Sequence, residues 1–204
     1  DDARPHLLRR RNHYIECRPR IGKRPVFTQA TEDILHVDDC VIDDAVKGAV
    51  AGIFAASGQT CIAGSRLLVQ DTIHDQFLDK LVKFAATAKL GNPRLPTTQV
   101  GPITTRPQHK KVLDYIGIAR DEGAELMLGG KPADVEGSKS GLFVQPSIFA
   151  GVKNNMRIAQ EEVFGPVLSV IRFRDEEEAL AIANDTLFGL ASGVWTTSMR
   201  RALN

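Results

Sequence analysis

Short apolar runs alternate with amphipathic segments along this 204-residue chain from about residue 36 onward. Runs such as SRLLVQ (65–70) and PVLSVIRF (166–173) have the length and composition of buried strands. Between such runs, apolar residues recur at spacings of three and four, for example over residues 43–54, which is typical of a helix with one buried face. Strands that alternate with helices form a parallel sheet through right-handed βαβ crossovers. We therefore predict an α/β fold built on a parallel sheet.

Local signals predict where several elements begin and end. Asp43, Thr72 and Asp175 are expected to cap helices, because a short side-chain oxygen can accept a hydrogen bond from a free backbone N–H of the first turn. Pro107 suits the first turn of a further helix, and Gly58 suits a left-handed residue after one. Additional strands are expected in AELMLGG (124–130), LFVQPSIFAGV (142–152) and GLASGVWTT (189–197), and a final helix is expected to begin in SMRRALN (198–204).

Residues 1–36 differ from the rest and are assigned to an atypical basic N-terminal segment. Eight Arg or Lys residues occur from Arg4 to Arg24 without helical or strand periodicity. A basic arm for an anionic partner is one interpretation. A poorly ordered or non-native terminus is the other, and we favour it because neither aromatic interleaving nor an amphipathic face supports binding. The ordered domain is therefore expected over residues 37–204.

Charge and cysteine usage exclude several classes of function. A formal net charge of +1 provides no basic field for nucleic acid or a membrane surface. No run of about 18 apolar residues is present, so no membrane-spanning helix is expected. The three cysteines include no CxxC pair and the histidines no HxxxH spacing, so neither a disulfide framework nor a metal site is predicted. A reducing, cytoplasmic compartment is the default expectation for such a chain.

Cys61 lies in SGQTCIAGSR (57–66), where small and polar residues replace the apolar neighbours of a buried cysteine. A thiolate is a strong nucleophile toward a carbonyl carbon, and a glycine-flanked loop lets the backbone N–H of Cys61 face a developing oxyanion. A small residue in a tight turn is the alternative, because a lone cysteine is a weak signal. Cys17 and Cys40 are interpreted as passive, and the acids around Cys40 are expected to raise the pKa of its thiol. Local sequence leaves both interpretations of Cys61 open.

A second unusual string is QEEVFGP (160–166), in which two acids precede a Gly-Pro break before a strand. Carboxylates at such an entrance are usually solvated and without a specific role. A carboxylate there could equally accept hydrogen bonds from a ribose diol, with the neighbouring aromatic residue packed on a planar ring. The residues of this string alone leave both interpretations open.

These two strings occur in one order with several others. The set is SGQTCIAGSRLLVQ, KLGNP, VGPI, IAQEEVFGPVLSVIRF and ANDTLFGLASGVWT. In this combination the chain resembles the catalytic domain of the aldehyde dehydrogenase superfamily, from about Val37 to Asn204. The specific part of the resemblance is GQTC followed by EEVFGP much farther along the chain. It implies a truncated α/β catalytic domain whose parallel sheet is built from βαβ crossovers.

The resemblance implies a role for each matching residue. Cys61 matches the nucleophile that attacks an aldehyde to form a thiohemiacetal; hydride transfer to a nicotinamide then leaves a thioester, which water hydrolyses. Glu162 matches the residue that binds the nicotinamide ribose, and Phe164 matches the aromatic residue beside the nicotinamide. Gln108 and Lys111 match positions that approach the ribose of the cofactor. The implied substrate is a small-molecule aldehyde, and the implied cofactor is NAD or NADP.

Three departures from the family pattern limit what the chain is expected to do alone. No ELGGK-like segment with a general-base glutamate precedes Cys61, and Glu32, which lies in that region, lacks the flanking Leu-Gly-Gly. The nucleotide-binding domain is missing, and with it the side-chain oxyanion Asn and most of the cofactor site. The chain also ends before the glycine-rich segment and the final strand that pairs between subunits. We interpret residues 1–35 as translation in a wrong frame or a divergent start, and an ELGGK-like segment in another frame of the encoding DNA is the observation that would support the former.

The leading functional interpretation is a catalytic-domain fragment of an NAD(P)-dependent aldehyde dehydrogenase, which oxidises an aldehyde to a carboxylic acid. Loss of the general base would slow deacylation by about 10²–10⁴-fold, so dehydrogenase activity of the chain alone is not expected. A cofactor-free thiol esterase that acts through Cys61 is the first alternative. A non-catalytic pseudo-enzyme or interaction domain is the second, and its uncovered faces would favour self-association into a homo-oligomer. The aldehyde and the choice between NAD and NADP stay open at this stage.

Overall fold

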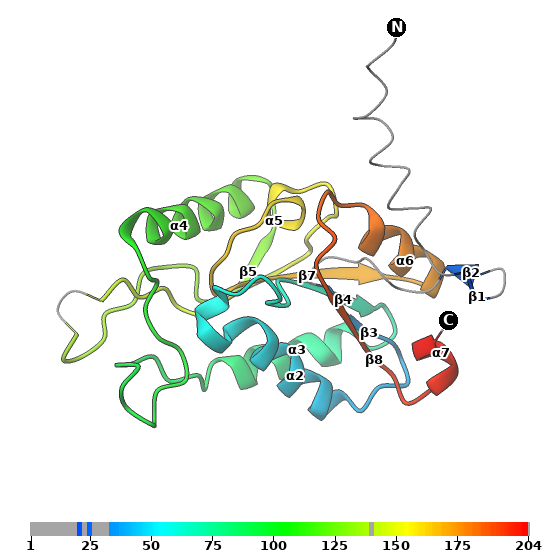
Figure 1. The fold of residues 1–204 in the computed structure, drawn as a ribbon, viewed down its shortest axis with the longest axis horizontal. Helices are drawn as coiled ribbons and strands as arrows, with labels where there is room; N and C mark the ends of the chain where they lie inside the picture. The colour runs from blue at the N-terminus through cyan, green and yellow to red at the C-terminus, as the bar shows by residue number, and fades with distance from the viewer. Residues whose placement is uncertain (1–19, 22–23, 26–32, 139–140, 204) are drawn as a thin grey trace, which may run out of the picture.

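The computed structural model describes residues 20–21, 24–25, 33–138 and 141–203 (Figure 1). The elements in chain order are β1 (Arg20–Ile21), β2 (Arg24–Pro25), β3 (Asp33–His36), α2 (Ile42–Phe54), the 3₁₀ helix η1 (Ala55–Gly58), β4 (Arg66–Gln70), α3 (His74–Ala85), α4 (Arg106–Asp121), β5 (Glu125–Leu128), β6 (Ser147–Ala150), α5 (Arg157–Gln160), β7 (Val167–Phe173), α6 (Glu176–Asn184), β8 (Ser192–Trp195) and α7 (Met199–Leu203). These elements confirm the predicted alternation of strands and helices.

A six-stranded sheet in the order β5-β6-β7-β4-β3-β8 forms the centre of the fold. Neighbouring strands are parallel throughout, except that β5 and β6 are antiparallel. The predicted parallel sheet is therefore confirmed apart from its β5 edge. The exception has a physical reason, because parallel neighbours need a crossover connection and the described residues between β5 and β6 form no helix.

The N-terminal region is described only in part. β3 (Asp33–His36) pairs with both β4 and β8, so the sheet begins a few residues before the boundary expected at residue 37. β1 and β2 form a separate antiparallel pair. The expected basic arm and the expected wrong-frame start otherwise fall on residues 1–19, 22–23 and 26–32, which lie outside the described residues.

Helices cover both faces of the sheet. Figure 1 shows α4 and α5 on one side of the sheet and α2 and α3 on the other. Consecutive residues of β4 point to opposite faces, so Leu67 and Val69 join the core under α2 and α3, whereas Leu68 joins the core under α4 and α6. Burial on both faces explains why the central strands read as continuous apolar runs.

The capping predictions met different outcomes. Asp175 is confirmed as the cap of α6, because its carboxylate accepts a hydrogen bond from the backbone N–H of Glu178 at 2.9 Å. The predictions for Asp43 and Thr72 are wrong, since neither α2 nor α3 has a side-chain cap. Asp43 lies inside the first turn of α2, and its carboxylate instead pairs with Lys80 of α3 at 2.5 Å. That ion pair links the two helices on the same face of the sheet.

His74 begins α3 with a ring that is only 2% exposed. Its Nδ1 lies 3.0 Å from the Oδ1 atom of Asp75, and the same oxygen binds Arg172. Burial lowers the pKa of His74, and Arg172 adds to this effect, whereas Asp75 and Asp71 oppose it. The folded chain therefore holds a neutral imidazole at a pH where an unfolded histidine begins to take up a proton.

We expect the free energy of unfolding to fall as the pH drops below about 6.5, the usual histidine pKa, and to be independent of His74 above it. Below that pH the unfolded chain binds a proton that the folded ring resists, so acid favours unfolding. Urea unfolding at pH about 7.5 and about 5.5 measures the effect. The fall should be smaller in His74→Gln, because glutamine has no proton to gain in this pH range. An identical fall in the parent chain and in His74→Gln would contradict this expectation.

Candidate active site

The two unusual strings of the sequence lie at one edge of the sheet. SGQTC (57–61) precedes β4, and EEVFGP (161–166) precedes β7. β4 and β7 are adjacent and parallel, with Arg66 opposite Ser169. The segments that lead into them therefore meet at the amino ends of these strands.

The cysteine loop, residues 55–64, begins with a left-handed turn. Ala56, Ser57 and Gly58 have φ angles of +48°, +58° and +68°. The left-handed conformation predicted for Gly58 is confirmed, and it starts two residues earlier than expected. Ser57 is buried, and its hydroxyl donates to the carbonyl of Gly101 at 2.8 Å. This bond ties the turn to the VGPI segment (100–103).

Ala56 adopts a conformation that glycine takes more readily. A left-handed conformation is unfavourable by about 1–2 kcal/mol for a residue with a Cβ atom. We expect Ala56→Gly to raise the free energy of unfolding by about 0.5–1 kcal/mol, since glycine relieves this strain but is more disordered when unfolded. The matched control is Ala51→Gly inside α2, which should lower it by about 0.5–1 kcal/mol. Urea unfolding distinguishes the two, and a loss of stability in Ala56→Gly would count against a strained turn.

Gln59 fixes the next part of the cysteine loop. Its Oε1 accepts hydrogen bonds from the backbone N–H and the hydroxyl of Thr104, both at 2.9 Å, and its Nε2 donates to the carbonyl of Pro102 at 3.4 Å. Cys61 follows two residues later with an exposed side chain. The cysteine is therefore accessible on a loop that is anchored on its N-terminal side.

Cys40 has the opposite environment. It is partly buried, and burial, followed by the negative charge of Asp39, raises the pKa of its thiol. The predicted direction is confirmed, with burial as the larger cause. Among the described cysteines, Cys61 is thus the accessible one. Cys17 lies outside the described residues.

The cysteine loop touches the EEVFGP segment through two glycines. A Cβ atom on Gly58 would lie 2.0 Å from the carbonyl oxygen of Gly165. A Cβ atom on Gly165 would lie 2.4 Å from Cγ2 of Val112 on α4. The turn after Phe164 is therefore held between the cysteine loop and α4, in a space that admits backbone only.

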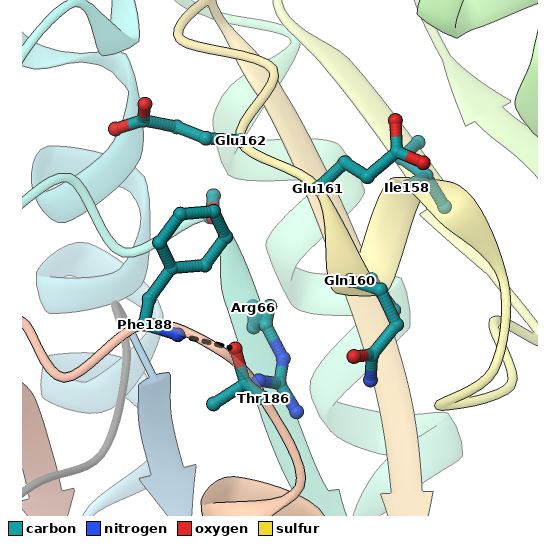
Figure 2. Close-up of a pocket in the computed structure, with 9 residues that line it drawn as sticks. Arg66, Ile158, Gln160, Glu161, Glu162, Thr186 and Phe188 are labelled. Carbon is teal, nitrogen blue, oxygen red and sulfur yellow. Dashed lines mark hydrogen bonds between the residues drawn. The ribbon is translucent and has the colours of Figure 1, made fainter. Parts of the chain in front are cut away.

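The two acids of EEVFGP have different environments. Glu161 has an extended backbone, and Figure 2 shows the side chains of Glu161 and Glu162 pointing in opposite directions. Glu161 accepts hydrogen bonds from Arg157 at 2.8 and 2.9 Å and from Tyr115 at 2.5 Å, and these contacts lower the pKa of Glu161 to about 2. Within the described residues, the carboxylate of Glu162 forms no hydrogen bond or ion pair. Glu161 is an anchor, and Glu162 is available to a ligand.

Gln108 and Lys111 lie beside this segment, as the sequence led us to expect. The Nε2 atom of Gln108 donates to the carbonyls of Val163 and Phe164, both at 2.9 Å, and the ammonium of Lys111 donates to the carbonyl of Glu162 at 2.7 Å. Their side chains thus hold the backbone next to Glu162 and Phe164. Their expected contact with the ribose of a cofactor stays a prediction.

Tyr115 and Arg157 were not predicted from the sequence. Burial, and then the hydrogen bond to Glu161, raise the pKa of Tyr115. The sequence contained a weak signal for both residues. Arg157 and Glu161 have the four-residue spacing of a helical ion pair, and Tyr115 lies four residues after Lys111.

A shallow cleft opens beside Glu162. It is lined by residues 158–162 together with Ser65, Arg66, Thr186 and Phe188. Figure 2 shows the ring of Phe188 and the side chain of Arg66 among these lining groups.

The described residues contain neither a candidate metal site nor a candidate membrane span. In the part of the chain that the structure describes, no three His, Cys, Asp or Glu side chains are grouped so that they could hold a metal ion. No helix within that part has both the length and the apolar character needed to cross a membrane.

Comparison with known proteins identifies the family. The model of the aldehyde dehydrogenase family matches residues 30–204. This chain belongs to the aldehyde dehydrogenase family. The resemblance inferred from GQTC and EEVFGP is thereby confirmed, and the match begins before β3, in agreement with the extent of the sheet.

Individual members of the aldehyde dehydrogenase family are similar to this chain in sequence. A betaine aldehyde dehydrogenase from Mesorhizobium japonicum is 47% identical over 169 residues, which cover 83% of this chain and 35% of the relative. An aldehyde dehydrogenase from Deinococcus radiodurans is 44% identical over 172 residues, which cover 84% of this chain and 33% of the relative. The chain therefore spans about a third of the length of the curated relatives that it matches.

Solved structures of aldehyde dehydrogenases share the fold. The betaine aldehyde dehydrogenase of Staphylococcus aureus in complex with NAD+ is 37% identical, with a TM-score of 0.82, and the match covers 87% of this chain and 35% of that one. The aldehyde dehydrogenase KauB from Pseudomonas aeruginosa is 43% identical, with a TM-score of 0.79, and the match covers 85% of this chain and 35% of that one. The predicted α/β architecture is confirmed, and this chain matches about a third of each of these solved chains.

Proposed function

We propose that this chain is a catalytic portion of an NAD(P)-dependent aldehyde dehydrogenase in which Cys61 is the nucleophile. The observation that carries the proposal is the backbone contact between Gly58 and Gly165. It brings the loop of Cys61 against the segment of Glu162 and Phe164. Oxidation of an aldehyde requires the substrate carbon and the hydride acceptor to be held together, and adjacent segments satisfy that need.

Cys61 has the surroundings that its proposed role requires. Its thiolate attacks the aldehyde carbon and forms a C–S bond, which gives a thiohemiacetal with an oxyanion. No acceptor for the backbone N–H of Cys61 is found among the described residues, so this N–H can donate to that oxyanion. Removal of hydride from the same carbon leaves a thioester on Cys61, and attack of water releases the carboxylic acid and the thiol.

The residues present fit one end of a nicotinamide dinucleotide. Glu162 offers a carboxylate without a partner among the described residues, which suits the two hydroxyls of the nicotinamide ribose. Phe164 would lie beside the nicotinamide ring, and Gln108 and Lys111 are next to both residues. A bound nicotinamide supplies the hydride acceptor. The NAD+ complex of the Staphylococcus aureus relative supports this assignment, and either NAD or NADP fits the residues described.

The wider setting follows from the same proposal. The substrate is a small-molecule aldehyde, as the names of the relatives suggest, and the reducing cytoplasm keeps the thiol of Cys61 available. Ile62, Leu187 and Met199 carry exposed apolar side chains, which association of the chain into a homo-oligomer would cover.

Calorimetric titration of the purified chain with NAD+ and with NADP+ tests the cofactor assignment. Saturable binding of one of them is expected, and Glu162→Gln should weaken it because a neutral amide is a poorer acceptor for two hydroxyl groups. The matched control is Glu125→Gln, on the exposed side of β5 away from the cleft. A parent chain that binds neither nucleotide would contradict the cofactor part of the proposal.

A cofactor-free thiol esterase is the second candidate function. The exposure of Cys61 on an anchored loop favours it, because transfer of an acyl group to an accessible thiolate needs no nicotinamide. An activated ester would acylate Cys61 and release its alcohol in one step. This candidate depends on the cysteine alone, so it survives a failure of nucleotide binding.

A further inference from the structure

One face of α4 contacts four consecutive residues of the EEVFGP segment. Gln108, Lys111 and Tyr115 are three and four residues apart, so they share a face of the helix. Gln108 donates to the carbonyls of residues 163 and 164, Lys111 to the carbonyl of residue 162, and Tyr115 to the carboxylate of residue 161. From Gln108 to Tyr115 along α4, the contacts move step by step from residue 164 back to residue 161. We call this row of contacts the template.

Arg157 stabilises the end of this template at Glu161. Its guanidinium forms two hydrogen bonds to Glu161 and lies 5.5 Å from the centre of the Tyr115 ring. The ammonium of Lys111 lies 5.6 Å from the same ring. The backbone N–H of Arg157 is in turn bound by Glu122 at the end of α4. Glu161 therefore has little freedom to turn away from the helix.

Residues 161–164, which these contacts hold, lie between α5 and β7 and belong to neither. β7 begins only at Val167, so the carbonyls of residues 162–164 have no strand partner in the sheet. Phe164 has a φ angle of +57°, a conformation that is unfavourable for a bulky residue. Both carbonyls nearest this strained residue are bound by Gln108. The donors on α4 thus replace the hydrogen bonds that a neighbouring strand would supply, next to the residue whose backbone conformation is least favourable.

We infer that Gln108, Lys111 and Tyr115 are positioning residues that hold Glu162 and Phe164 in their cofactor-binding conformation. Both N–H groups of the Gln108 amide and one N–H of the Lys111 ammonium are bonded to this backbone, whereas the carboxylate of Glu162 is unpaired among the described residues. Because Glu161 points toward α4, the extended backbone directs Glu162 to the opposite side. This inference rests on the proposed function of the same site.

Backbone ¹⁵N relaxation of the full 204-residue chain tests the template without any cofactor. In the parent chain, residues 162–164 should have order parameters of about 0.85, as in rigid structure. Gln108→Ala and Lys111→Met remove a donor and should lower these values to below about 0.6, with little change in the rest of the chain. Lys111→Arg retains a donor and should restore them. Lys110→Met is the control, because Lys110 lies on the exposed side of α4 and, among the described residues, pairs with Asp114.

Titration of the same variants with NAD+ separates positioning from direct binding. If the ordered conformation falls to a tenth of the population, the apparent affinity should fall about tenfold in Gln108→Ala and Lys111→Met, and it should recover in Lys111→Arg. Unchanged order parameters together with lost binding would overturn the inference, since the side chains would then contact the cofactor directly. Unchanged order and unchanged binding would overturn it as well. Lost order in the variants of a chain that binds no NAD+ would support the template while refuting the proposed function.

Discussion

Replacement of Cys61 by alanine is expected to slow the release of p-nitrophenolate from p-nitrophenyl acetate by at least about 100-fold, to the rate of spontaneous hydrolysis. The physical reason is that Cys61 is the exposed cysteine among those described, on a loop that Ser57 and Gln59 anchor to the VGPI segment. Release of p-nitrophenolate measures the rate. Mass spectrometry of the peptide that contains residue 61 should show the acetyl group in the parent chain and not in the variant.

Cys40→Ala is the matched control for this experiment. The thiol of Cys40 is partly buried, and both its burial and Asp39 raise its pKa, so little thiolate is present to react. The variant should therefore acetylate at the rate of the parent chain. Equal rates for the parent chain and Cys61→Ala would refute the nucleophile assignment. An equal loss in both variants would show that the assay reports folding rather than the reactivity of Cys61.

The architecture was largely predictable because it depends on local periodicity. β7 was expected over nearly the range that it occupies, and α6 was expected to begin at its cap, Asp175, since a continuous apolar run and a capping residue are signals within a few residues of each element. The order of the strands was not predictable in this way. That β4 lies between β7 and β3 is a fact about pairing, and it alone explains why Cys61 and Glu162 come together.

The predictions that failed did so where tertiary contacts prevailed over local signals. Asp43 has the chemistry of a helix cap, but α2 starts one residue before it and Lys80 engages its carboxylate. Ala56 and Ser57 have no intrinsic preference for the left-handed region, and the hydrogen bond from Ser57 to Gly101 helps to hold the turn there. Such contacts join residues far apart in the chain, so no window of sequence contains them.

Sequence motifs select the residues of the candidate site, but they do not distinguish the environments of Glu161 and Glu162. Glu161 and Glu162 are the same residue type at adjacent positions, and only the direction of each side chain makes one an anchor and the other available. The site also lies at the amino ends of β4 and β7, whereas ligands of open α/β sheets usually bind beyond the carboxyl ends of the strands. Fold class alone would therefore predict a site at the opposite edge of the sheet.

Replacement of Gly58 by alanine is expected to lower the free energy of unfolding by about 3–4 kcal/mol, a large part of the about 5–15 kcal/mol that stabilises a typical domain. Two effects contribute. The φ angle of +68° is unfavourable for alanine, and its Cβ atom would lie 2.0 Å from the carbonyl oxygen of Gly165, so the cysteine loop must move away from the EEVFGP segment. Urea unfolding measures the loss of stability.

Gly151→Ala separates these two effects. Gly151 has a similar φ angle of +64°, but a Cβ atom there would meet nothing within 4 Å. That variant should lose only the about 1–2 kcal/mol of the left-handed conformation. The additional loss of stability in Gly58→Ala then measures the contact between the cysteine loop and the EEVFGP segment. The rate at which Cys61 is acetylated under native conditions should change in Gly58→Ala and not in Gly151→Ala. Equal losses of stability in the two variants would mean that the cysteine loop and the EEVFGP segment can separate freely, and the principal argument for a shared site would fail.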